Sequence, residues 1–364
     1  MDMEPFGERC RRAGDLARAA GADSLLVADP ATVRWLTGRE QEIEFGPLHP
    51  ISAGTLVQLG PDGTGRIVCP VDDEANGPVV TGLEVRTYEG YTIGPLRPYA
   101  NALACLEPVA VLAIEADAVS ASFVQGRRWV DVTTDLRWLR AVKDSAEVAG
   151  IHEACRIASV GQRAFRVAAT PGRREIEVFS EVRAAMESAA GRRVAVLPDL
   201  MSGTRMMEVG RPPTDRIIGE DELVLCDLEA RYAGHWSDSC TTICTGTPSS
   251  EMRRLHAAVQ RTLDELIAAA RPGVIAGDLD ALARSRMADA GYRYPHHTGH
   301  GIGAGFHEEP RIVPRSPARI EAGMVLAFEP AGFGGGIGVR IEHIILVAQS
   351  GNEFLTDYDT RLES

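Results

Sequence analysis

The chain has 364 residues, of which 45% are hydrophobic and 24% are charged, and its formal net charge is −13 at pH 7. This length exceeds what one hydrophobic core usually supports, so the composition predicts a soluble protein of two domains. The strong negative charge argues against nucleic acid or an anionic membrane as a partner, because both repel an acidic surface.

The first part of the chain alternates helical and strand-like patterns. Helical periodicity covers residues 6–20, and the apolar run SLLVAD at 24–29 predicts a buried strand that ends at a proline turn. The further predicted elements are strands at 54–59, 66–69 and 109–114 and a helix at 99–106. Strands that alternate with helices indicate a small α/β layer domain, and its sequence contains no grouping of His, Asp and Glu typical of a site.

The segment LRAVKDSAE at residues 139–147 is predicted to connect this domain to a second one, which gives domains 1–140 and 141–364. The predicted long helices of the second domain are 145–169, 175–190, 250–270 and 276–290. Strand-like hairpins lie between these helices. This order indicates an α+β fold in which helices pack on an antiparallel sheet.

Two acidic residues lie in the first of these hairpins. The strand-like runs LVLCDLEA at 223–230 and HWSDSCTTICT at 235–245 are joined by a tight turn. With the turn centred on residues 232–233, Asp227 falls opposite Asp238. Opposed residues share one face of a sheet, and two like charges there are destabilising unless a cation lies between them.

A second hairpin repeats this pattern. The runs MVLAFEP at 324–330 and GVRIEHIILV at 338–347 flank three glycines at 334–336. With the turn centred on the glycines, Glu329 falls opposite Glu342. Both acids are embedded in apolar strand, where an unpaired carboxylate is costly.

Residues 295–310, PHHTGHGIGAGFHEEP, place four histidines in a glycine-rich segment. Glycine lets the backbone approach a ligand, and a histidine held there can bind a metal or move a proton. Taken singly, His300 would more often be a hydrogen-bonded core histidine, and Arg340 could neutralise an acid of the second hairpin. Both hairpins and this loop in one chain favour a shared metal site.

The order of these residues resembles the M24 metallopeptidases of the pita-bread fold, a family that includes methionine aminopeptidase, aminopeptidase P and prolidase. The resemblance rests on five positions: Asp227 and Asp238 in DLEARYAGHWSD, His300 in TGHGIG, Glu329 in FEP and Glu342 in GVRIEH. Residues 1–140 resemble the creatinase/prolidase-type N-terminal domain through the string RWLTG at 34–38.

The resemblance implies a site for two divalent metal ions. Asp227 would chelate one ion, and Asp238 and Glu342 would bridge both. His300 and Glu329 would complete the second. A water that bridges the ions would lose a proton readily and attack the scissile bond. Four carboxylates and one imidazole form a hard ligand set, which favours Mn(II), with Fe(II), Co(II) and Zn(II) as alternatives.

The resemblance also implies roles in catalysis and substrate binding. Glu329 would serve as general base toward the water, and His307 would stabilise the tetrahedral oxyanion or donate a proton. His296 would contact substrate near the leaving group. Apart from the resemblance, Arg340 is expected to orient carboxylates or contact substrate. Arg205 is expected either to hold a substrate carboxylate or to be a solvated loop arginine.

The chain departs from aminopeptidase P and prolidase at one position. These enzymes carry a histidine between a Ser-Gly element and a Pro-Thr-Asp-Arg string, and in SGTRMMEVGRPPTDR this position is Gly210. The first hypothesis is therefore a hydrolase like Xaa-Pro dipeptidases and aminopeptidases. The second is a non-peptide C–N hydrolase or lyase, resembling ectoine hydrolase or dimethylsulfoniopropionate lyase. The third is a non-catalytic binding module, which the complete ligand set disfavours.

The remaining expectations concern location and partners. No apolar run is long enough to span a bilayer, and MDMEPFGERC at the start lacks the apolar core of a signal peptide. Seven scattered cysteines fit reduced thiols, so a cytoplasmic protein is expected. Its substrate would be a small peptide or another small molecule, and the resemblance implies a homodimer.

Overall fold

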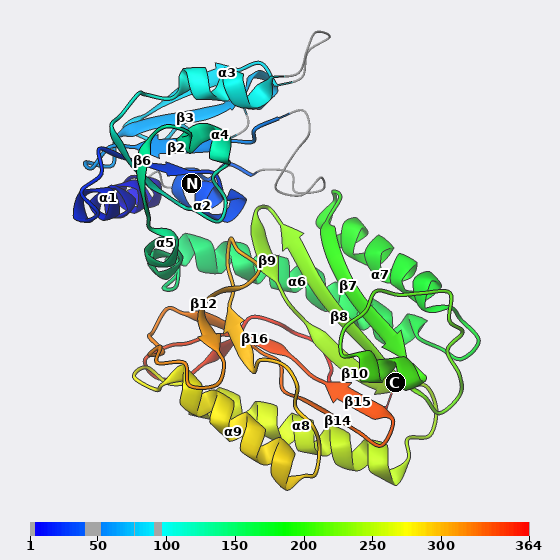
Figure 1. Ribbon diagram of the computed structural model, residues 1–364. Coiled ribbons are helices and arrows are strands. Elements are labelled where there is room, and N and C mark those ends of the chain that lie inside the picture. Colours follow the sequence, from blue (N-terminus) through cyan, green and yellow to red (C-terminus); the bar gives the residue numbers. More distant parts are fainter. Residues whose placement is uncertain (1–3, 41–51, 76, 91–96, 364) are drawn as a thin grey trace. The chain divides into compact units, whose positions relative to one another are not determined.

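The computed structural model describes residues 4–40, 52–75, 77–90 and 97–363. The chain divides into two compact units, Met1–Arg140 and Ala141–Ser364 (Figure 1). Each unit has hydrophobic cores of its own, as expected of separate domains. Within the described ranges, no helix combines the length and the apolar character that a membrane span requires.

The first unit is built on a mixed six-stranded sheet in the order β4-β3-β2-β1-β5-β6. Its strands are β1 Ser24–Val27, β2 Leu56–Leu59, β3 Gly65–Pro70, β4 Leu83–Tyr88, β5 Val111–Ile114 and β6 Arg128–Asp131. Its helices are α1 Glu4–Ala19, α2 Pro30–Thr37, α3 Pro98–Cys105, α4 Ala121–Val124 and α5 Thr133–Leu139, with a 3-10 turn η1 at Val71–Asp73. Helices α1, α2 and α5 share one core with the sheet, and α3 and α4 share the other, which confirms the predicted α/β domain.

One buried acid makes the stability of this unit depend on pH. Glu115 is 2% exposed and accepts a hydrogen bond from the Thr32 hydroxyl at 2.8 Å. Burial raises the pKa of Glu115 to about 7, the charge of Asp29 adds to this rise, and Arg140 opposes it. A carboxyl whose pKa is higher in the folded protein than in the unfolded chain contributes stability that is lost as pH rises through the folded pKa.

We therefore expect the wild type to lose stability as the pH rises, and Glu115→Gln to show no such loss from this group. The pKa rises from 4.5 to about 7 on folding, so the free energy of unfolding should fall by about 3 kcal/mol across that window. Urea unfolding of both proteins at several pH values measures this difference, in which the contributions of other groups cancel. Equal pH slopes for the two proteins would contradict the prediction.

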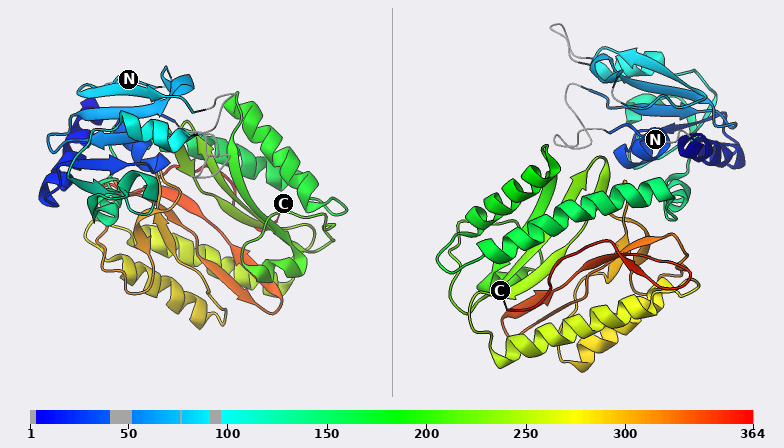
Figure 2. Two further views of the ribbon diagram at one scale, coloured as in Figure 1. Left: turned by 45° about the horizontal axis from the view of Figure 1, so that its top comes forward. Right: turned by 180° about the vertical axis from the view of Figure 1, so that it is seen from behind.

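The second unit packs two helix pairs on antiparallel strands (Figures 1 and 2). Its helices are α6 Ser145–Ala168, α7 Glu175–Ala190, α8 Ser250–Ala269 and α9 Ala276–Asp289, with a 3-10 turn η2 at Gly203–Glu208. One sheet contains β7 Ala195–Ser202, β8 Leu223–Tyr232, β9 His235–Ser237 and β10 Cys240–Cys244. The other contains β11 Gly299–Gly301, β12 Glu308–Ile312, β13 Val325–Phe328, β16 His343–Leu346 and β17 Glu353–Phe354, and β14 Ala331–Gly334 pairs with β15 Ile337–Arg340. This architecture confirms the predicted α+β order.

Helix α6 begins at Ser145, as predicted, because the residue before it forms a capping box. The Asp144 carboxylate accepts hydrogen bonds from the backbone N–H groups of Ala146 and Glu147, and the Glu147 carboxylate accepts one from Asp144 N–H. Helix α7 ends at Gly191, whose φ of 66° lies in the left-handed region that glycine adopts without strain.

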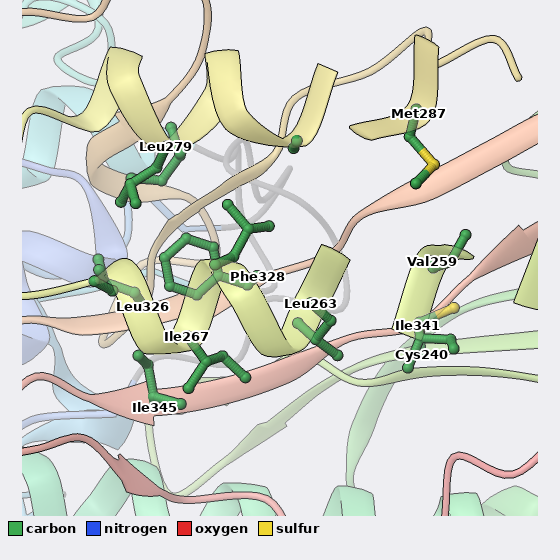
Figure 3. Close-up of a cluster of buried hydrophobic side chains, with 14 of the residues drawn as sticks. Cys240, Val259, Leu263, Ile267, Leu279, Met287, Leu326, Phe328, Ile341 and Ile345 are labelled. Atoms are coloured by element: carbon green, nitrogen blue, oxygen red, sulfur yellow. The ribbon is translucent and has the colours of Figure 1, made fainter. Parts of the chain in front are cut away.

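The hydrophobic cores of this unit fix which way the side chains of β8 point. Helices α6 and α7 share a core with Val224, Cys226 and Leu228 of that strand. Helices α8 and α9 pack on the other side of the strands, in the core that Figure 3 shows around Phe328. Because strand side chains alternate, Asp227 and Glu229 face away from the α6 and α7 core. The acids of β8 therefore lie on the interior face, between the two sheets.

Candidate metal centre

The first acidic hairpin is formed by β8 with β9 and β10, and its register differs from the prediction. Asp227 pairs with Cys240, and the same register places Asp238 across from Glu229. The prediction that Asp227 opposes Asp238 directly was wrong, because the turn residues are Ala233–Gly234, with φ of 49° and 79°. The error is two residues, so Asp238 stays on the face predicted for it.

The second acidic hairpin has the predicted register. The ladder pairs on either side of its break are Phe328 with His343 and Ala331 with Arg340. Between these pairs, Glu329 faces Glu342 across the hairpin. The turn is made by Gly335–Gly336, with φ of 60° and 82°, so glycine is needed there. The glycine turn thus places two buried carboxylates opposite each other.

His300 reaches both hairpins from β11, which pairs with β13. Its Nδ1 lies 2.9 Å from the Gly301 carbonyl, and because a carbonyl only accepts, Nδ1 carries the proton. Its Nε2 therefore presents a lone pair, 3.4 Å from Asp238 Oδ2 and 3.7 Å from Glu329 Oε1. Burial lowers the pKa of His300 to about 4. A neutral imidazole held in this way is what a metal ligand requires.

The structure brings together the five residues predicted as metal ligands. One ligand atom each from Asp238, His300 and Glu342 lies within 4.8 Å of the others, and the same holds for Asp227, Glu229 and Asp238. Glu329 completes the cluster through its contact with His300. All five predicted ligands are buried, with exposed fractions of 6% or less.

The electrostatics of this cluster call for cations. Among the described residues, Asp227 Oδ1, Asp238 Oδ1 and Glu342 Oε1 are buried without a hydrogen-bond partner. Burial raises the pKa of Asp227 to about 6, and burial with neighbouring negative charge raises the pKa values of Asp238 and Glu342 well above their ordinary range. Carboxylates gathered in this way are unfavourable unless a positive ion lies among them. Four carboxylates and one imidazole suit divalent ions that prefer oxygen ligands.

The predicted catalytic histidines lie beside the cluster. His307 Nδ1 is 2.8 Å from Arg311 Nη1, and because arginine only donates, Nδ1 accepts and Nε2 carries the proton. The ring centroids of His307 and His300 are 3.9 Å apart, and burial lowers the pKa of His307 to about 2. His296 lies 3.6 Å from Glu329 Oε2 through Nδ1, which also contacts the His297 carbonyl at 2.8 Å. Both predicted histidines therefore lie beside predicted metal ligands, His307 beside His300 and His296 beside Glu329.

The structure adds His297, which the sequence did not single out. Its Nε2 lies 2.5 Å from Glu329 Oε1. Burial opposes the negative charge of Glu329, but the close contact with His297 and the nearby rings of His296 and His300 outweigh it, so the pKa of Glu329 is held well below its ordinary value. The sequence does not indicate which of the adjacent residues His296 and His297 lies closer to the Glu329 carboxylate.

The two predicted arginines differ in their placement. Arg340 is 5% exposed, and its guanidinium pairs with Asp227, lies 3.6 Å from Asp199 Oδ2 and donates to the Val209 carbonyl. It thus orients a carboxylate of the cluster. Arg205 lies elsewhere, because its guanidinium pairs with the buried carboxylate of Glu175.

The expectation that Arg205 holds a substrate carboxylate stays a prediction, and the guanidinium already has protein partners. Its Nη2 also donates to the Pro212 carbonyl at 3.1 Å. Glu175 is fully buried and accepts further hydrogen bonds from the hydroxyls of Ser202 and Thr214. Arg205 therefore neutralises an interior acid that the sequence pattern did not connect to it.

Two acids at the centre were not predicted. Glu229 follows Asp227 by two residues on the same strand face, a period-2 signal that the sequence does contain, and burial raises its pKa to about 9. Asp199 on β7 pairs with Asp227 in the ladder, and burial raises its pKa as well. A Cβ atom built on Gly210 would lie 2.3 Å from Asp199 Oδ2. The Asp199 carboxylate therefore fills the space that a side chain at position 210 would need.

Comparisons with known proteins agree with this geometry. A model described as metallopeptidase family M24 matches residues 149–349, and one described as creatinase/prolidase N-terminal domain matches residues 9–142. An Xaa-Pro dipeptidase from Pyrococcus horikoshii is 32% identical over 230 residues, which is 62% of this chain and 66% of that protein. The matched region thus spans just under two thirds of that relative.

Solved structures match over nearly the whole chain. The prolidase from Pyrococcus horikoshii matches with a TM-score of 0.85 at 25% identity, over 98% of this chain and 99% of that one. The dipeptidase PepE from Mycobacterium ulcerans matches with a TM-score of 0.81 at 28% identity, over 100% and 98%. The predicted pita-bread fold and the predicted N-terminal domain are confirmed.

The fold and the family match place the chain in the class of metallohydrolases. The chain belongs to the M24 metallopeptidase family, and its architecture is that of a prolidase with a creatinase/prolidase-type N-terminal domain.

Proposed function

We propose that this chain is a dinuclear-metal hydrolase that cleaves a short peptide or amide bond, in the manner of Xaa-Pro dipeptidases and aminopeptidases. The observation that carries the proposal is the buried cluster of Asp227, Asp238, His300, Glu329 and Glu342, which leaves carboxylate oxygens without partners among the described residues. Two divalent ions, for which Mn(II) suits the donor set best, would supply Lewis acidity and an acidified water. Relatives called Xaa-Pro dipeptidase and prolidase support the choice of substrate.

The residues around the cluster would supply the proton transfers. Glu329, paired with His297, is held as a carboxylate and would accept a proton from the attacking water. His307 has its Nε2–H available and would donate a hydrogen bond to the oxygen that becomes negative during attack. His296 has an Nε2 without a partner in the described part of the chain and would face the leaving group. Arg340 would hold Asp227 in position.

A second candidate function acts on a non-peptide small molecule. It would be C–N hydrolysis, as in ectoine hydrolase, or an elimination, as in dimethylsulfoniopropionate lyase. The observation that favours it is the replacement at Gly210. Prolidase and aminopeptidase P place a histidine there, whereas here an acid, Asp199, fills the adjacent space. A carboxylate in that place changes the charge that a substrate meets. A binding module without catalysis is disfavoured, because the ligand set is complete.

An assay of purified, Mn(II)-loaded protein tests the proposal. The substrates are Gly-Pro, Ala-Pro, an Xaa-Pro tripeptide, creatine and ectoine, and the control is the same protein after treatment with a chelator. Metal-dependent release of proline would establish a proline-specific peptidase. If the protein binds metal but hydrolyses none of the peptides, the second candidate is favoured. A protein that binds no divalent ion would overturn both candidates.

The same proposal covers the assembly and the location of the protein. The family resemblance supports a homodimer in the cytoplasm, and light scattering after size-exclusion chromatography would measure the oligomeric state. A monomer at micromolar concentration would contradict the dimer.

A further inference from the structure

Three carboxylates of the first hairpin meet on one sheet face. Glu229 lies across from Asp238 in the register of β8 with β9 and β10, and it follows Asp227 by two residues on the same strand. One oxygen from each of the three lies within 4.8 Å of the others. Glu229 therefore stands as close to this group as the two acids that the family pattern contains.

A second group adjoins the first. One ligand atom each from Asp238, His300 and Glu342 also lies within 4.8 Å of the others. Asp238 belongs to both groups, and a carboxylate has two oxygens with which it can serve two ions. This arrangement fits two neighbouring ion positions that share Asp238. Glu229 and Asp227 would bind the same one of the two ions.

Two oxygens of this group lack a partner among the described residues. Asp227 is 5% exposed and Asp238 is 4% exposed, and Oδ1 of each has no hydrogen-bond partner among the residues that the structure describes. Arg340 pairs with the other oxygen of Asp227 and so does not satisfy Oδ1. A buried carboxylate oxygen without a donor is costly. Both atoms belong to residues of the group that contains Glu229.

We propose that Glu229 is a sixth protein ligand of the metal centre, bound to the ion that Asp227 and Asp238 hold. The inference rests on the proposed dinuclear site. With Glu229 added, the ligands of this first ion are all carboxylates, whereas the second ion keeps one imidazole. An all-oxygen site of higher negative charge favours hard ions such as Mn(II) over Zn(II). It also occupies a coordination position that would otherwise be open to water or substrate.

Titration calorimetry with MnCl2 on chelator-treated protein tests the proposal. The wild type should bind two ions, and Glu229→Gln, which keeps the shape and removes the charge, should weaken one of the two by about tenfold to a hundredfold. The matched control is Asp199→Asn, which removes a neighbouring acid on the same face that lies outside both groups. Unchanged affinities in Glu229→Gln, or an equal loss in Asp199→Asn, would overturn the assignment.

Thermal unfolding separates a ligand from a residue that merely supports the fold. Burial of an acid beside other acids costs stability in the metal-free protein, so Glu229→Gln should raise Tm without metal and reduce the rise in Tm that Mn(II) causes. A structural role predicts the reverse, a lower Tm without metal and an unchanged rise. If Glu229→Gln does not fold, Glu229→Asp keeps the charge on a shorter side chain and should weaken one site by less.

The outcomes also distinguish this inference from the proposed function. A wild-type protein that binds no Mn(II) would defeat both. A wild type that binds two ions, with a Glu229→Gln variant that binds them equally well, would defeat only the role of Glu229.

Discussion

Asp238→Asn is expected to abolish metal binding and hydrolysis together, while the metal-free protein becomes more stable to heat. Asp238 belongs to two of the three groups of candidate ligand atoms, and it is 4% exposed beside Glu342 and Asp227. Without metal, burial of this acid beside its acidic neighbours costs stability, so the amide should raise Tm. With metal, the amide lacks the charge that would hold two ions, and activity should fall by more than about a hundredfold.

Differential scanning fluorimetry with and without Mn(II), combined with metal analysis of dialysed protein, measures both effects. The control is Asp289→Asn, which removes an exposed acid at the end of α9 and should change neither quantity. An Asp238→Asn variant that retains activity would refute the assignment of this residue as a bridge. A variant with lower stability in the absence of metal would show that Asp238 supports the fold by some other contact.

The two acidic hairpins show how far the sequence could specify the site. Glu329 and Glu342 were paired correctly because consecutive glycines mark the turn and fix the register. Asp227 was paired with the wrong partner because the turn begins at Ala233, a residue that seldom adopts φ above zero. Strand side chains alternate with a period of two, so an error of two residues leaves every side chain on the same face of the sheet. The face predicted for Asp238 is therefore correct although its partner is not.

Strand and turn patterns in the sequence do not predict contacts between segments that are far apart in the chain. Asp199 lies on β7, a strand that the sequence did not predict, because Pro198 interrupts its apolar run. Its position across from Asp227 depends on pairing between segments 28 residues apart. The pair of Arg205 with Glu175, 30 residues earlier in another helix, likewise has no signal in the local sequence. Local periodicity predicts elements and faces, whereas tertiary pairing decides which charges meet.

Lys143→Met is expected to cause a large loss of stability in the second unit. Lys143 Nζ lies 2.8 Å from Glu308 Oε2, and the two side chains are 0% and 1% exposed. Glu308 also accepts a hydrogen bond from Gly305 N–H at 2.8 Å, so it organises the loop that carries His307. Removal of the ammonium leaves a buried carboxylate without its counter-charge, which costs about 3–5 kcal/mol.

A double-mutant cycle tests this assignment. Lys143→Met/Glu308→Gln removes both charges and should recover much of the stability that Lys143→Met loses, because a buried neutral pair carries a smaller desolvation cost. Urea unfolding of the four proteins gives the coupling energy. The Mn(II) content of the folded variants should remain that of the wild type, since neither residue belongs to the metal cluster. Turnover should fall, however, because His307 precedes Glu308 directly and depends on the same loop. Additive losses in the cycle would contradict the coupling, and loss of metal in Lys143→Met would show that the pair positions the ligands themselves rather than His307.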